Sequence, residues 1–209
     1  MVKKLKPIFS SNSDIYKNAY MNWRTSRYDE VGNLKVVSEG FQYAATTMSE
    51  NLLRDNSCHQ ADSLIFPILY SIDQSIELCF KAILDELDLL EEKKPNNYMH
   101  HDIRLLYNTM VSQINRKETK TKGLQSALKD ISEYINELYK QIGCEKPKLD
   151  FARYPFDTDR NPHFYVCSTE NVVVDLENLL ERFNRMMDAL DGIYLMYRHE
   201  IEVKEEWHD

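Results

Sequence analysis

The sequence predicts an all-α fold, a bundle of four to five main helices. Apolar residues recur at steps of three and four along five stretches of the chain, which is the spacing of one face of a helix. Polar segments, several with glycine or proline, separate these stretches. With 209 residues and 43% hydrophobic content, the chain is long enough to bury a core without disulfide bonds or a metal ion.

The predicted organisation is an N-terminal lead-in segment, residues 1–38, followed by a single helical domain, residues 39–209. The lead-in begins with a loose stretch that contains Pro7 and the polar run "SSNS". The first helix is expected from about Glu39 to Leu53, because "EGFQYAATTMSENLL" places its apolar residues on one side. The polar run "RDNSCHQAD" ends this helix.

The second predicted helix is the longest apolar stretch, and we expect it to open at Ser63 and to end before "EEKKPNN". Pro67 is tolerated if it lies in the first turn, where few intrahelical bonds are donated. The stripe that faces the core consists of Ile65, Leu69, Ile72, Ile76, Phe80, Ile83 and Leu87. The same helix carries Asp73, Glu77 and Lys81 one turn apart, which is unexpected in so apolar a segment.

Three further helices follow. Asp102 can cap a shorter helix that runs to about Ile114, because its carboxylate accepts from the free amides of a first turn. A fourth helix is predicted over residues 124–142. The last one is long, and Asp175 is expected to cap it. Its apolar stripe extends to Ile201, and we place the run "RHE" at 198–200 on its solvated face.

One segment does not have a helical pattern. "FYVCSTENVVVD" contains two short runs of residues that favour strands, separated by a polar turn. A small β-hairpin is therefore predicted near residues 164–174.

The charge of the chain limits its partners. The formal net charge is −8, so most of the surface should repel nucleic acid. Any contact with RNA is expected to be local, at "RKETKTK" (116–122) or at "RYPFDTDR" (153–160). In the first of these segments the candidate phosphate contacts are Lys117, Lys120 and Lys122.

The cysteines and the apolar runs exclude several classes of site. The four cysteines lie far apart, without the spacing of a zinc knuckle or a redox pair, and we expect them to be reduced, buried thiols. No cofactor or metal ion is predicted. No signal peptide is seen and no run approaches about 18 consecutive apolar residues, so a soluble, cytoplasmic protein without membrane contact is expected.

Three motifs then occur in order: "SIELCFKAIL" at 75–84, "HDIRLL" at 101–106 and "ARYPFD" at 152–157. Together they resemble a branch of the HEPN superfamily, helical nucleotide- and RNA-associated domains that are common in prokaryotic toxin–antitoxin and antiphage loci. That branch has an apolar helix with a Glu…Lys pair, a later His-Asp before a helix, and an Arg-Tyr-Pro loop. The resemblance spans about residues 40–200.

The residues of these motifs have structural interpretations. A Glu77–Lys81 pair at i, i+4 stabilises a helix by only a few tenths of a kcal/mol. It is therefore either an ordinary solvated pair or a site where Glu77 anchors Arg153 of the Tyr-Pro loop. His101 is expected to bond to backbone at the start of its helix. It cannot easily share a metal ion with the adjacent His100.

The resemblance also implies a possible activity. Catalytic members of the superfamily carry an arginine followed four to six residues later by a histidine, and they cleave RNA without a metal ion at a site shared by two subunits. The literal match here is "RDNSCH", Arg54 to His59, which precedes the long apolar helix instead of opening a later one. The alternative is a working face of Arg153, Arg160 and His163, although "RNPH" is shorter than the motif.

Two functions follow from these observations. The first is a HEPN-like protein of a prokaryotic conflict or defence system that acts as a mostly non-catalytic module, binding RNA or a protein partner of the same operon. The second is a metal-independent HEPN endoribonuclease with an Arg/His site at a dimer interface. A homodimer is expected in both cases, because the long helices leave apolar residues such as Leu179, Phe183 and Leu190 to be covered.

Overall fold

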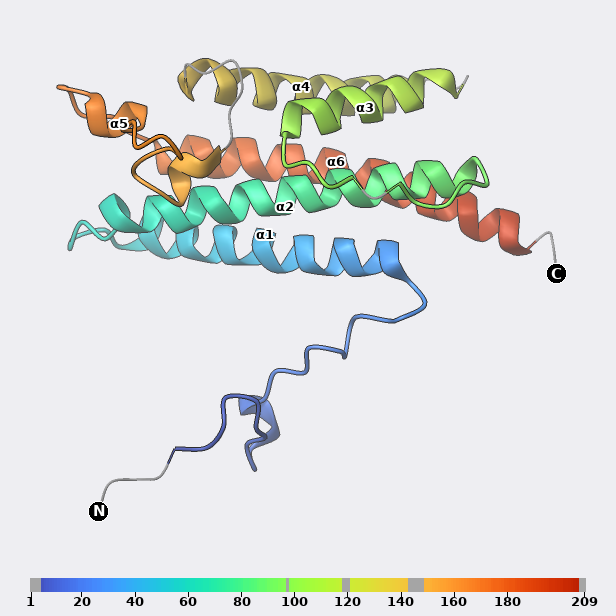
Figure 1. Cartoon of the computed structure of the whole chain (residues 1–209), viewed down its shortest axis with the longest axis horizontal. Coiled ribbons are helices and arrows are strands. Elements are labelled where there is room, and N and C mark those ends of the chain that lie inside the picture. The colour runs from blue at the N-terminus through green and yellow to red at the C-terminus, as the bar shows by residue number, and fades with distance from the viewer. Residues whose placement is uncertain (1–4, 97, 118–120, 143–148, 207–209) are drawn as a thin grey trace.

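The computed structural model describes residues 5–96, 98–117, 121–142 and 149–206, and the all-α prediction is confirmed (Figure 1). The described residues form no strand beyond one isolated bridge between Phe156 and Pro162. The helices are α1 (Glu30–Arg54), α2 (Ala61–Leu90), α3 (Ile103–Arg116), α4 (Lys122–Ile142), α5 (Phe164–Cys167) and α6 (Leu176–Glu206), with two 3-10 turns, η1 (Ile15–Lys17) and η2 (Leu149–Ala152).

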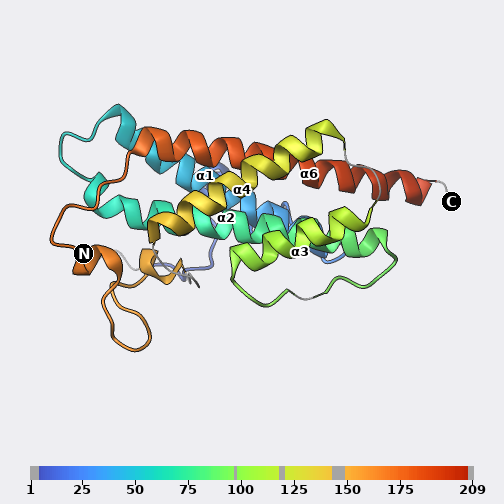
Figure 2. The same cartoon turned by 90° about the horizontal axis from the view of Figure 1, so that it is seen from above.

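The long helices form three layers. In Figure 1, α1 lies on one side, α2 and α6 lie in the middle, and α3 and α4 cover the opposite side. Figure 2 shows α4 crossing above α2 and α6. Helix α2 is the central element, since it packs against α1, α6 and α3. The core side chains that are fully buried include Phe80, Ile83, Met110, Ile131 and Phe183.

Helix α1 begins earlier than predicted, at Glu30 instead of Glu39. Asp29 caps it by accepting from the Gly32 amide at 2.9 Å. The additional turns are part of the bundle, because Val31 is buried in the core. Only residues 5–29 lie outside the bundle, and they extend away from it as an arm (Figure 1). We call these residues the N-terminal arm.

Helix α2 is apolar enough to raise the question of a membrane. By length and mean hydropathy it is the one helix among the described residues that could cross a bilayer. Half of its most apolar window is buried inside the bundle. Pro67 lies in the second turn instead of the first, at an exposed position, and the helix continues through it.

The predicted β-hairpin at 164–174 is wrong. The segment begins with the helical turn α5 and continues without strands. The Tyr165 hydroxyl donates to the Phe151 carbonyl at 3.1 Å, and its ring packs 5.2 Å from that of Phe66 on α2. These contacts with distant residues hold the turn, and the β-branched run that suggested a strand, Val172–Val174, is exposed.

The prediction that residues 198–200 are solvated is also wrong for Arg198. Its guanidinium bonds to Glu86 at 3.2 Å and to the cap residue Asp29 at 3.3 Å, joining α6 to α2 and to the start of α1. Glu86 is fully buried, and burial raises the pKa of its carboxyl while the Arg198 charge opposes that effect. This ion triad therefore joins the buried Glu86 to two partly exposed partners at the edge of the core.

Two of the residues proposed to drive dimerisation are not available for it. Phe183 and Leu190 are fully buried within their own chain, in the contact between α6 and its neighbours, while Leu179 is half-buried. The stripe of α6 is thus covered by α2 and α4 of the same subunit. A homodimer stays a prediction, but it cannot form through these core side chains.

Candidate functional site

The candidate site is built on a polar row along α2, formed by Asp73, Glu77 and Lys81. These residues stand one turn apart, so they share one side of the helix. That side is not solvated: Glu77 is 3% exposed, and the Lys81 side chain is 14% exposed. Because charged groups are costly to bury, each requires a partner.

The loop after α2 supplies a partner for Glu77. Residues 91–96 and 98–102 return along the bundle and are held by Asp88, which is buried near the end of α2. Its Oδ2 accepts from the Asn96 amide at 3.0 Å and from the Tyr98 hydroxyl at 3.0 Å. Gln113 on α3 donates to the same Tyr98 oxygen at 2.9 Å. Asp88 therefore fixes the course of the loop, which ends at His101.

His101 then contacts the buried carboxylate. Its Nδ1 lies 2.9 Å and 3.1 Å from the two oxygens of Glu77, and the Lys81 ammonium donates to the same carboxylate at 2.7 Å. The His101 side chain is 79% exposed, so most of its ring faces solvent. The expectation that His101 bonds to backbone is wrong, because its Nδ1 bonds to the Glu77 side chain of α2. Glu77 is the hub that joins two of the three motifs.

The next residue confirms its predicted role and adds a second contact. Asp102 caps α3 by accepting from the Leu105 amide at 3.0 Å, and it also accepts from the Tyr139 hydroxyl of α4 at 3.2 Å. The Tyr139 oxygen accepts from the Arg104 amide at 3.1 Å, and the Arg104 guanidinium lies 3.9 Å above the ring. Arg104 and Tyr139 were not predicted, since their pairing depends on how α4 packs on α3.

Asp73 lies one turn before Glu77 and titrates abnormally. Burial, with the nearby Glu77 charge, raises its pKa to about 7, and Arg153 acts in the opposite direction. Its Oδ1 is buried without a hydrogen-bond partner. The predicted anchor between Glu77 and Arg153 is therefore wrong: Arg153 pairs with Asp150 at 3.8 Å, and the carboxyl of the row whose titration it affects is Asp73.

The three catalytic candidates of the Tyr-Pro loop have separate surroundings. The Arg153 guanidinium lies 5.8 Å from the centre of the Tyr70 ring. Arg160 is exposed in a left-handed turn with φ of 67°. The His163 ring stacks on Tyr165 at 6.4 Å, and its Nε2 is buried without a partner. In this part of the chain, which is fully described, no hydrogen bond, ion pair or ring contact joins the three side chains.

The second candidate pair lies in the turn between α1 and α2. The Arg54 Nε donates back to the Glu50 carbonyl of its own helix at 3.4 Å, and His59 has a left-handed φ of 54°. Both side chains are exposed. This turn is at the same end of the bundle as α5, as Figures 1 and 2 show, but no contact joins the pair to Arg160 or His163 among the described residues.

The lysines proposed to bind RNA lie at the other end. Lys117 follows α3 and its ammonium lies 5.9 Å from the Tyr197 ring of α6, while Lys122 begins α4. Figure 2 shows this end of the bundle opposite to α5. Lys120 lies outside the described residues. The predicted cations therefore do not form one continuous surface.

The remaining candidate chemistry concerns metal ions and thiols. Among the residues that the structure describes, no group of three or more His, Cys, Asp or Glu side chains could hold a metal ion. The expectation of buried thiols holds for Cys79 and is wrong for Cys58 and Cys167, which are exposed. Cys144 lies outside the described residues.

No protein-family model matches the chain, and the searches of curated proteins and of solved structures find no match.

Proposed function

We propose that this chain is a HEPN-like protein of a prokaryotic conflict or defence system, and that it acts by binding a protein partner rather than by catalysis. The observation that carries the proposal is the composition and placement of the N-terminal arm. Its large apolar side chains are each more than half exposed: Leu5, Ile8, Phe9, Ile15, Tyr16, Tyr20, Met21, Trp23 and Tyr28. Soluble proteins rarely expose so dense an apolar surface unless another molecule covers it.

The arm is attached to the bundle only at its base. Arg24 bonds to Glu39 on α1 at 2.7 Å, and the Ser26 amide donates to the Asn33 side chain at 2.8 Å. The arm extends away from the bundle, as Figure 1 shows, and within it the Tyr20 and Trp23 rings lie 6.1 Å apart. Tyrosine and tryptophan are enriched at protein interfaces, so this composition suits a binding segment.

The charge distribution favours a protein over RNA as that partner. Residues 1–29 carry six Lys and Arg against two Asp, a net charge of +4, so the remainder of the chain carries −12. The strongly acidic bundle would repel a phosphate backbone. The lysines at 117 and 122 also lie far from the Tyr-Pro loop. A binding segment that is both aromatic and basic is better matched to an acidic protein surface.

Replacement of two arm aromatics tests the proposal. Tagged chains would be co-expressed with the neighbouring genes of the locus, and the proteins recovered with them would be compared. We expect Tyr20→Ser/Trp23→Ser to lose a partner that the parent retains. Tyr43→Ser is the matched control, since Tyr43 is an exposed aromatic residue on α1 outside the arm. Equal recovery with all three chains would contradict the proposal.

A second candidate function is favoured by His101. His101 is held through Nδ1 by a buried carboxylate, and the rest of its exposed ring is free to act as an acid–base group, while Lys81 on the same carboxylate supplies positive charge. This would suit metal-independent RNA cleavage, with His101 replacing His163 as the acid–base group. The test is cleavage of total RNA at low salt with chelator present: His101→Ala should abolish it and His163→Ala should not. Absence of cleavage by the parent chain would remove this candidate.

A further inference from the structure

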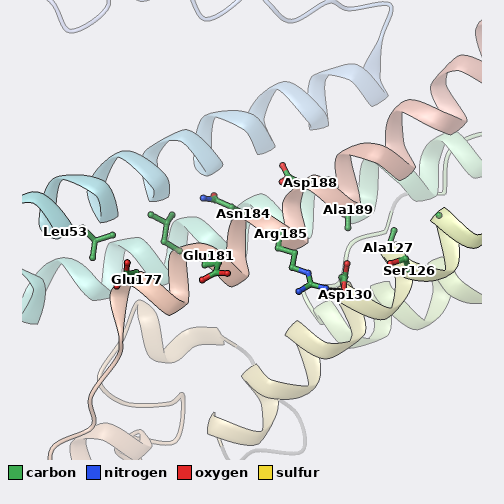
Figure 3. A pocket seen from close by; sticks show the side chains of 12 residues that line it. Leu53, Ser126, Ala127, Asp130, Glu177, Glu181, Asn184, Arg185, Asp188 and Ala189 are labelled. Atoms are coloured by element: carbon green, nitrogen blue, oxygen red, sulfur yellow. Dashed lines mark hydrogen bonds and ion pairs between the residues drawn. The ribbon is translucent and has the colours of Figure 1, made fainter.

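An open groove runs along the bundle between α4 and α6 (Figure 3). Its lining is mainly acidic, whereas the N-terminal arm is basic. Its volume is about 980 Å³. The lining is apolar at four positions, namely Leu53 at the end of α1, Ala127 on α4, and Leu180 and Ala189 on α6. The acidic residues of the lining are Asp130, Glu177, Glu181 and Asp188.

The groove lining has four carboxylates and one cation, Arg185, which interacts with Asp130 and with Glu181. Arg185 bonds to Asp130 at 2.6 Å across the groove, as Figure 3 shows. Glu177, Glu181 and Asp188 form no ion pair with any described residue, and all three are exposed. They follow one another along α6 at spacings of four and seven residues, so they present a line of negative charge on one face of that helix.

The arm has the complementary pattern. Its described part carries four cations, Lys6, Lys17, Arg24 and Arg27, interspersed with the exposed aromatic residues, against only two aspartates. Aromatic rings can fill an apolar groove while flanking cations meet an acidic rim, which is how complementary interfaces combine affinity with register. The arm thus supplies cations and aromatic side chains that complement the acidic and apolar lining of the groove.

We infer that the N-terminal arm of one copy of this chain occupies the α4–α6 groove of a second copy. The inference deepens the proposed function and rests on it, since it requires the arm to be a binding segment. By two-fold symmetry the second arm occupies the first groove, so two equal contacts form. The arm of residues 5–29, with one groove on each copy, is comparable in size to a standard interface of about 20–30 residues a side.

A second copy is a better occupant than the arm of the same chain. The arm starts at the Glu30 end of α1, whereas Leu53, which lines one end of the groove, lies near the far end of that helix, about 35 Å away at 1.5 Å per residue. The bonds of Arg24 and Ser26 hold the base of the arm on the first turns of α1. Beyond them the arm runs away from the bundle in Figure 1. Docking within one chain would require it to turn back around α1.

Complementary charge reversals test the inference. One variant changes only the arm, Lys17→Glu/Arg27→Glu, and the other changes only the groove, Glu177→Lys/Glu181→Lys. Light scattering at micromolar concentration should give the parent twice the 24.8 kDa mass of one chain, and each variant alone the mass of a monomer. An equimolar mixture should regain the dimer mass, because the reversed arm meets the reversed groove and the unaltered arm meets the unaltered groove.

The control and the contradicting results are distinct. Glu170→Lys/Glu200→Lys makes the same change of charge at exposed positions outside the groove and should remain a dimer. A monomeric parent, variants that stay dimeric, or a mixture that stays monomeric would each overturn the inference. If the parent is monomeric but Tyr20→Ser/Trp23→Ser still loses a partner of the locus, the proposed function stands alone. If that double variant changes neither partner recovery nor mass, both fail.

Discussion

The Nδ1 of His101 lies 2.9 Å from Oε1 of Glu77, so an almost fully exposed imidazole contacts one of the most buried carboxylates of the protein. The two residues are 24 positions apart and belong to different motifs. Lys81 shares the same carboxylate at 2.7 Å. Glu77 therefore connects the central helix to the returning loop, which explains why an apolar helix contains a charged row.

Removal of Glu77 should be costly. Glu77→Ala leaves the Lys81 ammonium, whose side chain is 14% exposed, without its carboxylate, and frees the end of the loop. We expect a loss above about 1.5 kcal/mol in the free energy of unfolding, measured by urea denaturation, which exceeds what surface pairs contribute. Glu133→Ala is the control, because Glu133 forms an exposed i, i+4 pair with Lys129 at 3.5 Å. Equal losses for both variants would contradict this prediction.

Asp73 should make stability depend on pH. Its pKa is about 7 in the folded protein against an ordinary value of 3.8, so between these values the unfolded chain binds fewer protons than the folded one. Its contribution to stability therefore falls as the pH rises from about 4 to about 7 and stays low above that. Asp73→Asn should be more stable than the parent by about 1–3 kcal/mol at pH 8 and nearly equal at pH 4.

The comparison should be made by urea denaturation at both pH values. Asp62→Asn serves as the control for loss of one charge at an exposed position of the same helix. A difference between Asp73→Asn and the parent that does not change with pH would show that the Asp73 carboxyl titrates normally, contrary to this account.

Arg198 should matter far more than a solvated arginine. Arg198→Ala leaves the fully buried Glu86 carboxylate without its cation and weakens the tie to Asp29. We expect a loss of about 2–3 kcal/mol, below the full value for a buried pair because the Arg198 side chain is 31% exposed. The double variant Arg198→Met/Glu86→Gln should recover most of it.

The control for this series is Arg182→Ala on the same helix, since Arg182 is exposed and bonds only to the Asn178 side chain at 3.2 Å. It should change the melting temperature very little. A melt of Arg198→Ala that superimposes on that of Arg182→Ala would mean that the triad contributes no stability.

The helices could be predicted from the sequence because their signals are local. Apolar spacing identified each long helix, and Asp102 caps α3 as expected. The early start of α1 is not evident from the sequence because Gly32, a poor helix former, lies in its first turn. The hairpin was wrongly predicted because β-branched residues outweighed the contacts of Tyr165, which come from residues far along the chain.

The site was predictable only in part, because most of its contacts join residues that are far apart in the sequence. The motifs indicate Glu77, Lys81, His101 and Asp102. In the structure Lys81 and His101 both bond to Glu77, and the next residue, Asp102, bonds to Tyr139. Their partners could not be assigned from spacing, since the loop position depends on Asp88 and the packing of α4. The sequence predicts the arm only as a loose lead-in, because no local pattern indicates whether another molecule covers an aromatic-rich segment.

The environment of Trp23 tests the central claim, that the N-terminal arm is a binding segment, most directly. The sequence has two tryptophans, so a Trp207→Phe background leaves Trp23 as the sole indole. In the free chain its side chain is 81% exposed. The account predicts that Trp23 fluorescence shifts to shorter wavelength and resists acrylamide quenching as the protein concentration rises, and that Lys17→Glu/Arg27→Glu prevents this. Emission typical of an exposed indole at every concentration, and also in complexes recovered with partners of the locus, would contradict the account.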